Sequence, residues 1–344
     1  MIRIFEHTTF ISPKSLVSYR GNPIDRNRTL IASSLPSNKF KFMAFSADKD
    51  FPKNIIPLPE NKLWPFRLFR FKPDIIHTRL MPSCLRSLKV AKLSNRRIKH
   101  LISIHGMPET WRMDNSSIKR INKLIEKADV IHTVSLTTAQ EVKEEWGQDA
   151  VIIYNGIDID LFHPNPIRRA LNTFNVLFVG RLVSHKHPEL IVELAKKYPE
   201  INFSMIGQGE MYDEIAKEIK LLDNIKIMQV PYSEMPSIYQ KHDVFVFPST
   251  HEGFSNAVLE ALASGLPVIA FKASSLDEVV KDQYNGYLCD DLKEMGRKVE
   301  QLTHNQENLE QMSINARKSI LIFDWKKIIK EYETLFENLA SDNF

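Results

Sequence analysis

Residues 243–271, DVFVFPSTHEGFSNAVLEALASGLPVIAF, have the pattern of a strand, a helix and a second strand. The apolar run at 243–249 ends in a polar turn, Ser255 and Asn256 are residue types that cap helices, and the run at 267–271 is again apolar. Strands that are apolar almost throughout are typical of parallel sheets covered by helices on both faces. This stretch therefore predicts one strand–helix–strand unit of a parallel sheet.

The same alternation runs along the rest of the chain in two series. The first has apolar runs at 2–5, 41–45, 74–78, 101–105, 129–135 and 151–155, and the second at 175–180, 202–207, 225–228, 243–249 and 267–271. Amphipathic stretches separate these runs. Two such series predict an α/β protein with two doubly wound, Rossmann-like domains, each on its own parallel sheet. Because such sheets bind ligands at the carboxyl ends of their strands, we expect the ligand in a cleft between the domains.

The boundary between the two domains is expected in the stretch 158–173, which contains two prolines and no periodic pattern. We therefore place an N-terminal domain at 1–165 and a C-terminal domain at 166–325. Residues 326–344 are predicted to form a final helix, because apolar residues recur there at helical spacing.

The composition is typical of a soluble globular protein. Of the 344 residues, 43% are hydrophobic and 26% are charged, and the longest apolar runs are far too short to span a bilayer. The first residues contain no apolar segment of signal-peptide length, so we expect a cytoplasmic protein. The two cysteines, Cys84 and Cys289, give neither a disulfide framework nor metal-site spacing, which fits a reducing compartment.

Positive charge is concentrated in the first half of the chain. Residues 1–160 hold 26 lysines and arginines against 16 acidic residues, although the whole chain has a net charge of only +4. Basic and apolar residues alternate in WPFRLFRFK (64–72) and RSLKVAKLSNRRIK (86–99). Such stretches suit an anionic membrane surface or a phosphate-bearing partner, and alternatively they are solvated helix faces. We expect no nucleic-acid partner.

Two cations follow the strand in the stretch FVGRLVSHK (178–186). Gly180 lets the chain turn where the strand ends, and Arg181 and Lys186 then lie at the carboxyl edge of the sheet, where a phosphate would bind. The alternative is an ordinary turn, because a glycine and two cations follow many strands by chance. Gly207, in the next such turn, either approaches a nucleotide closely or forms a tight connection.

Two carboxylates frame the helix of the first stretch. Glu252 comes just after a strand, and the N–H groups at the start of the following helix point toward the same place, which makes an anion site. Glu260 lies among apolar residues of that helix, where a carboxylate is costly unless it is hydrogen-bonded. Vicinal ribose hydroxyls would satisfy it, and alternatively Glu260 faces solvent or pairs with a lysine. His77 and His132, which lie in apolar runs, are expected to be hydrogen-bonded core or edge residues.

The stretch EGFSNAVLEALASGLPVIAF (252–271) resembles the E-x7-E signature of retaining glycosyltransferases of family 4, which have the GT-B fold. Other stretches match the family in the same order: ISIHG (102–106), ADVIHTVS (128–135), VIIYNGIDIDLFHP (151–164), FVGRLVSHK (178–186), FSMIGQGE (203–210) and FDW (323–325). The resemblance runs from about residue 74 to the end of the chain. So many matches in one order are hard to obtain by chance.

The resemblance implies roles for individual residues. Glu252 would contact the donor sugar, and Glu260 would hold the nucleotide ribose. Arg181 and Lys186 would neutralise the diphosphate of a UDP- or GDP-linked sugar. His105, after the strand LISIH, would lie near the transferred sugar.

The resemblance also implies roles for backbone N–H groups and for two glycines. Phe254, Ser255 and Asn256 would present N–H groups to phosphate or sugar oxygens of the donor, with Gly180 and Gly207 beside the nucleotide. It further implies that the final helix packs back on the N-terminal domain. These expectations define one donor site, built mainly from the C-terminal domain.

Fixed cations at the leaving diphosphate make a metal ion or another cofactor unnecessary, so we expect neither. The triplets DKD (48–50) and DID (158–160) are then chance matches to a metal-binding motif. One departure from the family stands at the N-terminus. The segment IFEHTTFISPKSLVS (4–18) lacks the Gly-Gly turn that often follows the first strand, so its contact with the donor is expected to differ.

The expected activity is transfer of a hexose, with retention, from a nucleotide sugar to a glycan or lipid-linked acceptor of surface polysaccharide assembly. The basic N-terminal domain would bind the acceptor and attach the protein peripherally to the inner face of the cell membrane. Two alternatives stay open at this point. One is a GT-B-like enzyme of another type, a sugar-nucleotide epimerase or a glycosyl phosphorylase, and the other is a non-catalytic sugar-binding or partner subunit.

Overall fold

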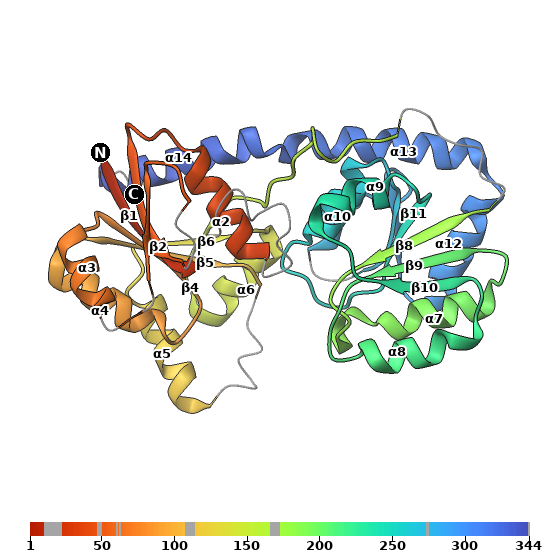
Figure 1. Cartoon of the computed structure of the whole chain (residues 1–344), viewed down its shortest axis with the longest axis horizontal. Coiled ribbons are helices and arrows are strands. Elements are labelled where there is room, and N and C mark those ends of the chain that lie inside the picture. The colour runs from red at the N-terminus through yellow and green to blue at the C-terminus, as the bar shows by residue number, and fades with distance from the viewer. Residues whose placement is uncertain are drawn as a thin grey trace. The chain divides into compact units, whose positions relative to one another are not determined.

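The computed structural model describes residues 1–9, 23–46, 50–59, 61, 63–106, 114–165, 173–272 and 275–342. The chain divides into two compact units (Figure 1). Unit 1 contains Met1–Asn155 together with Lys326–Phe344, and unit 2 contains Gly156–Trp325. Within its described part, no helix is both long and apolar enough to cross a bilayer.

Unit 1 is built on a parallel sheet whose strand order, over the described residues, is β3-β2-β1-β4-β5-β6-β7. Its strands are β1 (Ile2–Thr9), β2 (Phe40–Phe45), β3 (Ile55–Leu58), β4 (Ile75–Arg79), β5 (Lys99–Ile104), β6 (Val130–Thr133) and β7 (Val151–Ile152). Its helices are α2 (Pro23–Ser34), α3 (Trp64–Phe71), α4 (Cys84–Ser94), α5 (Asn115–Ile125), α6 (Leu136–Trp146) and α14 (Trp325–Ala340). Every strand pair is parallel, as the unbroken apolar runs predicted.

The two faces of this sheet carry different side chains, because successive residues of a strand point to opposite faces. One face is apolar and packs on α3, α4 and α5, through Leu68, Leu88 and Leu124. The other face carries polar residues in the middle of the sheet and lies under α2 and α14. Figure 1 shows α2 and α14 on one side of the sheet and α3, α4 and α5 on the other.

Helix α14 completes unit 1. Its Phe336 ring lies 6.2 Å from the ring of Phe40 and 6.1 Å from that of Phe42, which are both on β2. Lys39, just before β2, forms ion pairs with Glu333 (3.0 Å) and Glu337 (3.1 Å) on the outer side of the helix. The apolar stripe of α14 therefore packs against the first strands of the chain.

Unit 2 is built on a second parallel sheet with the order β10-β9-β8-β11-β12-β13. Its strands are β8 (Asn175–Val179), β9 (Asn202–Ile206), β10 (Ile225–Met228), β11 (Val244–Phe247), β12 (Val268–Phe271) and β13 (Gly286–Cys289). Its α-helices are α7 (Pro188–Lys197), α8 (Tyr212–Glu218), α9 (Met235–Tyr239), α10 (Asn256–Ala263), α11 (Leu276–Val279), α12 (Leu292–Thr303) and α13 (Gln306–Ile320). The strand order reverses between β8 and β11, so this edge is the switch point at which doubly wound sheets bind ligands.

The segment that begins unit 2 pairs with the segment that ends it. The Ile157 N–H donates to Phe323 O (2.8 Å), and the Trp325 N–H donates to Ile157 O (3.1 Å). A Cβ atom at Gly156 would collide with the Trp325 ring, so only glycine fits there. The stretches NGID and FDW, whose paired residues Ile157 and Asp324 are 167 positions apart, are therefore two halves of one structural contact.

Candidate functional site

The switch point of unit 2 brings two loops together. One is the turn after β8, which contains a short 3-10 helix, η2 (Ser184–Lys186), and the other follows β11. The Thr250 N–H donates to His185 O (3.0 Å), and the Ser249 hydroxyl donates to the same oxygen (3.2 Å). These bonds hold the two loops in one local structure at the carboxyl edge of the sheet.

Lys186 and Glu252 meet across these two loops. The Lys186 ammonium donates to the Glu252 carboxylate, and both side chains are largely buried. The ammonium also lies 4.9 Å from the centroid of the Phe247 ring, at the end of β11, which favours a cation through the ring quadrupole. Two of the predicted site residues are thus in direct contact.

Arg181 lies on the same turn, five residues before Lys186, and its side chain is exposed. Among the described residues, the guanidinium makes neither an ion pair nor a hydrogen bond. A planar fork of donors without a protein partner suits phosphate oxygens.

The two glycines of the predicted site lie against each other. A Cβ atom at Gly207 would collide with the carbonyl oxygen of Gly180, because the Gly180 N–H donates to Ile206 O (3.0 Å) and draws the two strand ends together. This close approach of backbones explains the glycine at 207. The chain bends at Gly180, directly after β8, as the sequence predicted, although Gly180 does not adopt the left-handed conformation.

His187 is a site residue that the sequence did not single out. It follows Lys186 and adopts the left-handed conformation (φ +48°), which costs a non-glycine residue roughly 1 kcal/mol. Its ring nitrogens lie 2.9 Å from Glu189 Oε1 and 3.3 Å from Thr250 Oγ1. These contacts hold the strained residue, and they fix the position of Lys186 just before it.

Helix α10 begins at the same edge with its predicted residues in place. Ser255 occupies the N-cap position, as the sequence predicted, but its side chain makes no capping hydrogen bond. The Asn256 Oδ1 atom is buried and has no hydrogen-bond partner. Phe254 is buried and packs its ring 5.5 Å from that of Phe323. The start of α10 therefore presents polar groups that the protein itself does not satisfy.

Glu260, in the middle of α10, is buried and bound by two tyrosines. Its Oε1 atom accepts a hydrogen bond from the Tyr232 hydroxyl (3.2 Å), and its Oε2 atom accepts one from the Tyr239 hydroxyl (3.0 Å). The alternative that Glu260 faces solvent is therefore wrong. Two tyrosine hydroxyls, one at each oxygen, thus orient the carboxylate.

Further contacts hold the tyrosines in turn. The Phe162 ring lies 5.8 Å from the rings of both Tyr232 and Tyr239. The Arg317 guanidinium, from α13, donates to Phe162 O (2.7 Å), Ile159 O (2.8 Å) and Ala263 O (2.9 Å). This arginine therefore joins the first residues of unit 2 to the end of α10.

His105 belongs to unit 1 and follows β5. Its Nε2 atom is buried without a hydrogen-bond partner, and its ring lies edge-on to that of His132 at 6.3 Å. Burial lowers the pKa of His105 well below its usual value. The imidazole is therefore neutral at physiological pH, with one ring nitrogen left for a ligand.

Metal ligands do not gather in the parts of the chain that the structure describes: no three His, Cys, Asp or Glu side chains are placed to hold an ion. Asp158, of the triplet DID, accepts hydrogen bonds from the N–H groups of Asp160 (3.1 Å) and Leu161 (2.9 Å) and so closes a turn. The triplet DKD lies largely outside the described residues, as does most of the segment that follows β1. The absence of a metal or another cofactor stays a prediction.

Unit 2 is thus a doubly wound α/β unit with a lysine–carboxylate pair at its switch point, the place where proteins of this class bind their ligands. Sequence comparisons name the family. The family model "Glycosyl transferases group 1" matches residues 162–319, and the model "Glycosyltransferase Family 4" matches residues 43–161. An uncharacterized glycosyltransferase of Haemophilus influenzae is 30% identical over 254 residues, which are 70% of this chain and 70% of that protein. The chain therefore belongs to this glycosyltransferase family, as its motifs predicted.

Solved structures share the fold over the whole chain. A sucrose-phosphate synthase from Thermosynechococcus elongatus has a TM-score of 0.81 at 19% identity, over 99% of this chain and 100% of that chain. The Anabaena protein HepE, in complex with UDP-glucose, has a TM-score of 0.79 at 19% identity, over 98% and 100% of the two chains. The predicted fold class, GT-B with two Rossmann-like parallel-sheet domains, is confirmed.

Proposed function

We propose that this glycosyltransferase is a retaining enzyme that moves a hexose from a UDP- or GDP-linked donor to a glycan or lipid-linked acceptor. The observation that carries the proposal is the contact between Lys186 and Glu252 at the switch point of unit 2, in a chain that belongs to a glycosyltransferase family. The structure of HepE with UDP-glucose supports a nucleotide sugar as the donor.

The diphosphate would bind between Arg181 and Lys186. Arg181 is exposed and would close on the phosphate oxygens, while Lys186 would exchange part of its contact with Glu252 for the diphosphate. The N–H groups at the start of α10 would add hydrogen bonds to the same oxygens. Negative charge grows on the diphosphate as the glycosidic bond breaks, so fixed cations there lower the barrier without a metal ion.

The sugar and the ribose would bind the remaining polar groups. Glu252 would accept hydrogen bonds from sugar hydroxyls, and Asn256 would use the side-chain oxygen that has no protein partner. Glu260, held by two tyrosines, would accept from the ribose hydroxyls. His105 would bond a hydroxyl of the transferred sugar as a neutral ring, so it would not oppose positive charge at the anomeric carbon. The acceptor would bind unit 1, and retention would follow from attack on the face that the diphosphate leaves.

The experiment measures nucleotide release from a panel of UDP- and GDP-sugars with and without candidate acceptors, and identifies the anomeric configuration of the product by NMR. Glu252→Ala should lower kcat by about 100-fold or more, because it removes a group at the reacting sugar. Glu200→Ala, an exposed glutamate of unit 2, is the matched control and should leave the rate unchanged.

The same experiment separates the alternative functions. A donor sugar that changes its own stereochemistry without any acceptor would assign an epimerase instead. Saturable binding of a nucleotide sugar without turnover, in the wild type as in Glu252→Ala, would assign a non-catalytic subunit. A product with inverted anomeric configuration would overturn the retaining mechanism, but the assignment as a transferase would stand.

A further inference from the structure

We propose that helices α3, α4 and α5 of unit 1 form a docking face for the surface of an anionic phospholipid bilayer. The docking face consists of the exposed residues of these three helices and of Leu63, just before α3. This inference does not depend on the transferase chemistry, because it concerns the opposite side of unit 1's sheet from α2 and α14.

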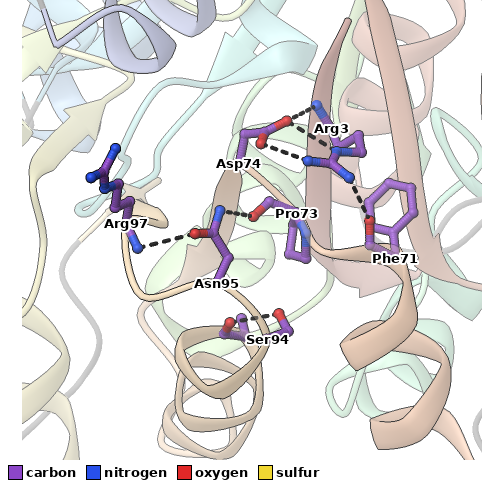
Figure 2. Close-up of polar contacts among 8 residues, drawn as sticks. Arg3, Phe71, Pro73, Asp74, Ser94, Asn95 and Arg97 are labelled. Carbon is purple, nitrogen blue, oxygen red and sulfur yellow. Dashed lines mark hydrogen bonds and ion pairs between the residues drawn. The ribbon is translucent and has the colours of Figure 1, made fainter.

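The charge of the docking face is almost entirely positive. Its exposed cations on α3 and α4 are Arg67, Arg70, Arg86 and Lys89, and the one acidic residue from Leu63 to Ser94 is Asp74. Asp74 accepts hydrogen bonds from the Arg3 backbone N–H (2.8 Å) and from its guanidinium (3.0 Å), so its charge is already compensated (Figure 2). Helix α5 adds three cations and no acidic residue. No carboxylate of the three helices therefore offsets their cations.

Figure 2 also shows how the ends of this surface are fixed. The Asn95 side chain donates to Pro73 O (3.0 Å) and accepts from the Arg97 N–H (3.0 Å), which holds the turn after α4. The Arg97 guanidinium points away from these contacts. The turn thus presents a further cation beside α4.

Large apolar side chains stand among these cations. Leu63 is 61% exposed, Phe66 63%, Phe69 47% and Leu93 76%. On the other side of α3, Trp64 and Leu68 are buried in the core, so the helix is fully seated and its exposed phenylalanines are not core residues turned outward. A helix with one buried face and an outer face of aromatic and basic residues is suited to a membrane interface.

The three helices form one continuous surface. Helix α4 packs against α3 and α5 (Figure 1). The Arg86 guanidinium lies 5.3 Å from the centroid of the Trp64 ring across the α3–α4 contact. A groove of about 520 Å³ lies between α4 and α5. Its floor is aliphatic (Leu85, Leu88) and its rim carries lysines (Lys89, Lys123). An aliphatic floor with an ammonium rim matches the acyl chain and phosphate of an anionic lipid.

Other occupants fit this surface less well. A second copy of the chain that paired through this same face would place like charges opposite each other, which costs binding energy. A nucleic acid or another soluble polyanion would use the cations but would leave the exposed phenylalanines and leucines in water. The bilayer is the partner that uses both kinds of side chain.

The test is sedimentation of the full chain with vesicles of phosphatidylglycerol and, separately, of phosphatidylcholine. We expect at least about tenfold stronger partitioning into the anionic vesicles, because each cation near such a surface contributes about 1 kcal/mol. Added salt should weaken this partitioning. The double variant F66S/F69S should lose about tenfold or more of it, because two aromatic side chains no longer leave water. R67E/R70E should lose at least as much.

Matched controls lie on unit 2. L221S/I314S removes two apolar side chains that are 93% and 61% exposed, and K217E/K220E reverses two exposed lysines. Both should bind vesicles like the wild type, and all variants should keep the wild-type melting temperature. Equal binding to both kinds of vesicle, or losses as large in the unit 2 controls, would overturn the proposal. Complete competition by a soluble polyanion, with no effect of F66S/F69S, would assign a polyanion site instead.

Discussion

The two parallel sheets have the same winding but place their polar side chains differently. In unit 1, Glu6, His77, Ser103 and His132 lie buried on four neighbouring strands, in the middle of the sheet. In the described strands of unit 2, Ser204 is the only buried polar residue, and the other polar groups gather where the strands end. The comparison separates two uses of polarity: in unit 1 it is part of the core, and in unit 2 it lines a site.

The polar row of unit 1 has one consistent set of donors. Ile153 O can only accept, so the His132 Nε2–H donates to it (3.1 Å). His132 Nδ1 must then accept from the Ser103 hydroxyl (2.7 Å), and Ser103 Oγ must accept from His77 Nε2–H (2.7 Å). His77 Nδ1 is left as an acceptor. The carbonyl at one end of the row therefore sets the tautomer of both histidines.

At the other end, two groups reach His77 Nδ1: the Arg28 guanidinium (2.7 Å) and the Glu6 carboxyl (2.8 Å). The Arg28 N–H fills the one lone pair of Nδ1, and a charged Glu6 oxygen would be repelled by that lone pair, so this contact favours the protonated carboxyl. Burial agrees with this, because it raises the pKa of Glu6 to about 7 and lowers the pKa of His77 well below its usual value. The two histidines of the row are therefore neutral, and Glu6 is mostly neutral below pH about 7, which limits the cost of buried charge.

The two units should differ most in how their free energy of unfolding depends on pH. Burial lowers the pKa of five histidines in unit 1 (His7, His77, His100, His105, His132), and in unit 2 it lowers the pKa of His242. The unfolded chain takes up protons on these groups below pH 6.5, whereas the folded chain does not. Each therefore lowers the free energy of unfolding by up to about 1.4 kcal/mol per pH unit as the pH falls.

Glu6 acts in the opposite direction, because its pKa is raised. Its contribution is full below pH about 4.5 and is lost as the pH rises through about 7. One carboxyl does not offset five histidines, so unit 1 should lose several kcal/mol between pH 6.5 and 5. Hydrogen exchange resolved by peptide, corrected for intrinsic rates, should show lower protection in β4–β6 than in β8–β12 at pH 5. His304→Asn, at an exposed position, should not change this result, and equal protection of both sheets would contradict the interpretation.

A serine in each sheet gives a sharper form of the same comparison. Ser103→Ala leaves one histidine donor and one histidine acceptor buried without partners, so it should lower the free energy of unfolding by about 2–4 kcal/mol. Ser204→Ala, also on a buried strand, breaks no side-chain hydrogen bond that the structure shows, and should cost less than about 1 kcal/mol. Urea unfolding followed by circular dichroism measures both. Similar losses in the two variants would mean that the polar row of unit 1 is not a coupled chain.

The sequence predicted the architecture because the buried strands of a parallel sheet can be recognised as continuous apolar runs. It also predicted that Lys186 and Glu252 lie close together, because both follow strands that end at one edge. His77 and His132 were expected to be hydrogen-bonded core or edge residues, and the structure places both in hydrogen bonds. These successes rest on the strand period and on sheet topology alone.

The tyrosine pair at Glu260 could not be predicted. Tyr232 and Tyr239 lie 28 and 21 residues before the carboxylate, and the contacts depend on how α9 packs against α10. The left-handed backbone of His187 was not predicted either, because that conformation is typical of glycine and the sequence has a histidine there. Contacts between side chains of different helices, such as that of Tyr239 with Glu260, can be identified only from the assembled fold.

Arg181 tests the other side of the comparison, because it is a polar group with no role in the core. Arg181→Ala should lower kcat/KM about 100-fold, since a cation at the leaving diphosphate is lost. The melting temperature should stay at the wild-type value, because the side chain is exposed and contacts no described partner. Arg297→Ala, an exposed arginine of α12, should change neither quantity. A loss of stability without a loss of activity would place Arg181 in the fold and not in the site.

Tyr232→Phe has the smallest expected effect. It tests whether the hydrogen bond from Tyr232 to Glu260 serves nucleotide binding or the stability of the fold. Tyr239 is fully buried, whereas Tyr232 is half-buried, so removing its hydroxyl should disturb the core little and mainly release one oxygen of Glu260. If Glu260 holds the ribose, the variant should bind the nucleoside diphosphate of the donor about five- to tenfold more weakly, the value of one charge-assisted hydrogen bond. The 2′,3′-dideoxy form of that nucleotide should bind wild type and variant equally, because it offers the carboxylate no hydroxyl. Calorimetric titration of both nucleotides decides between the two uses: equal weakening for both would make the tyrosines part of the core, as the histidines of unit 1 are.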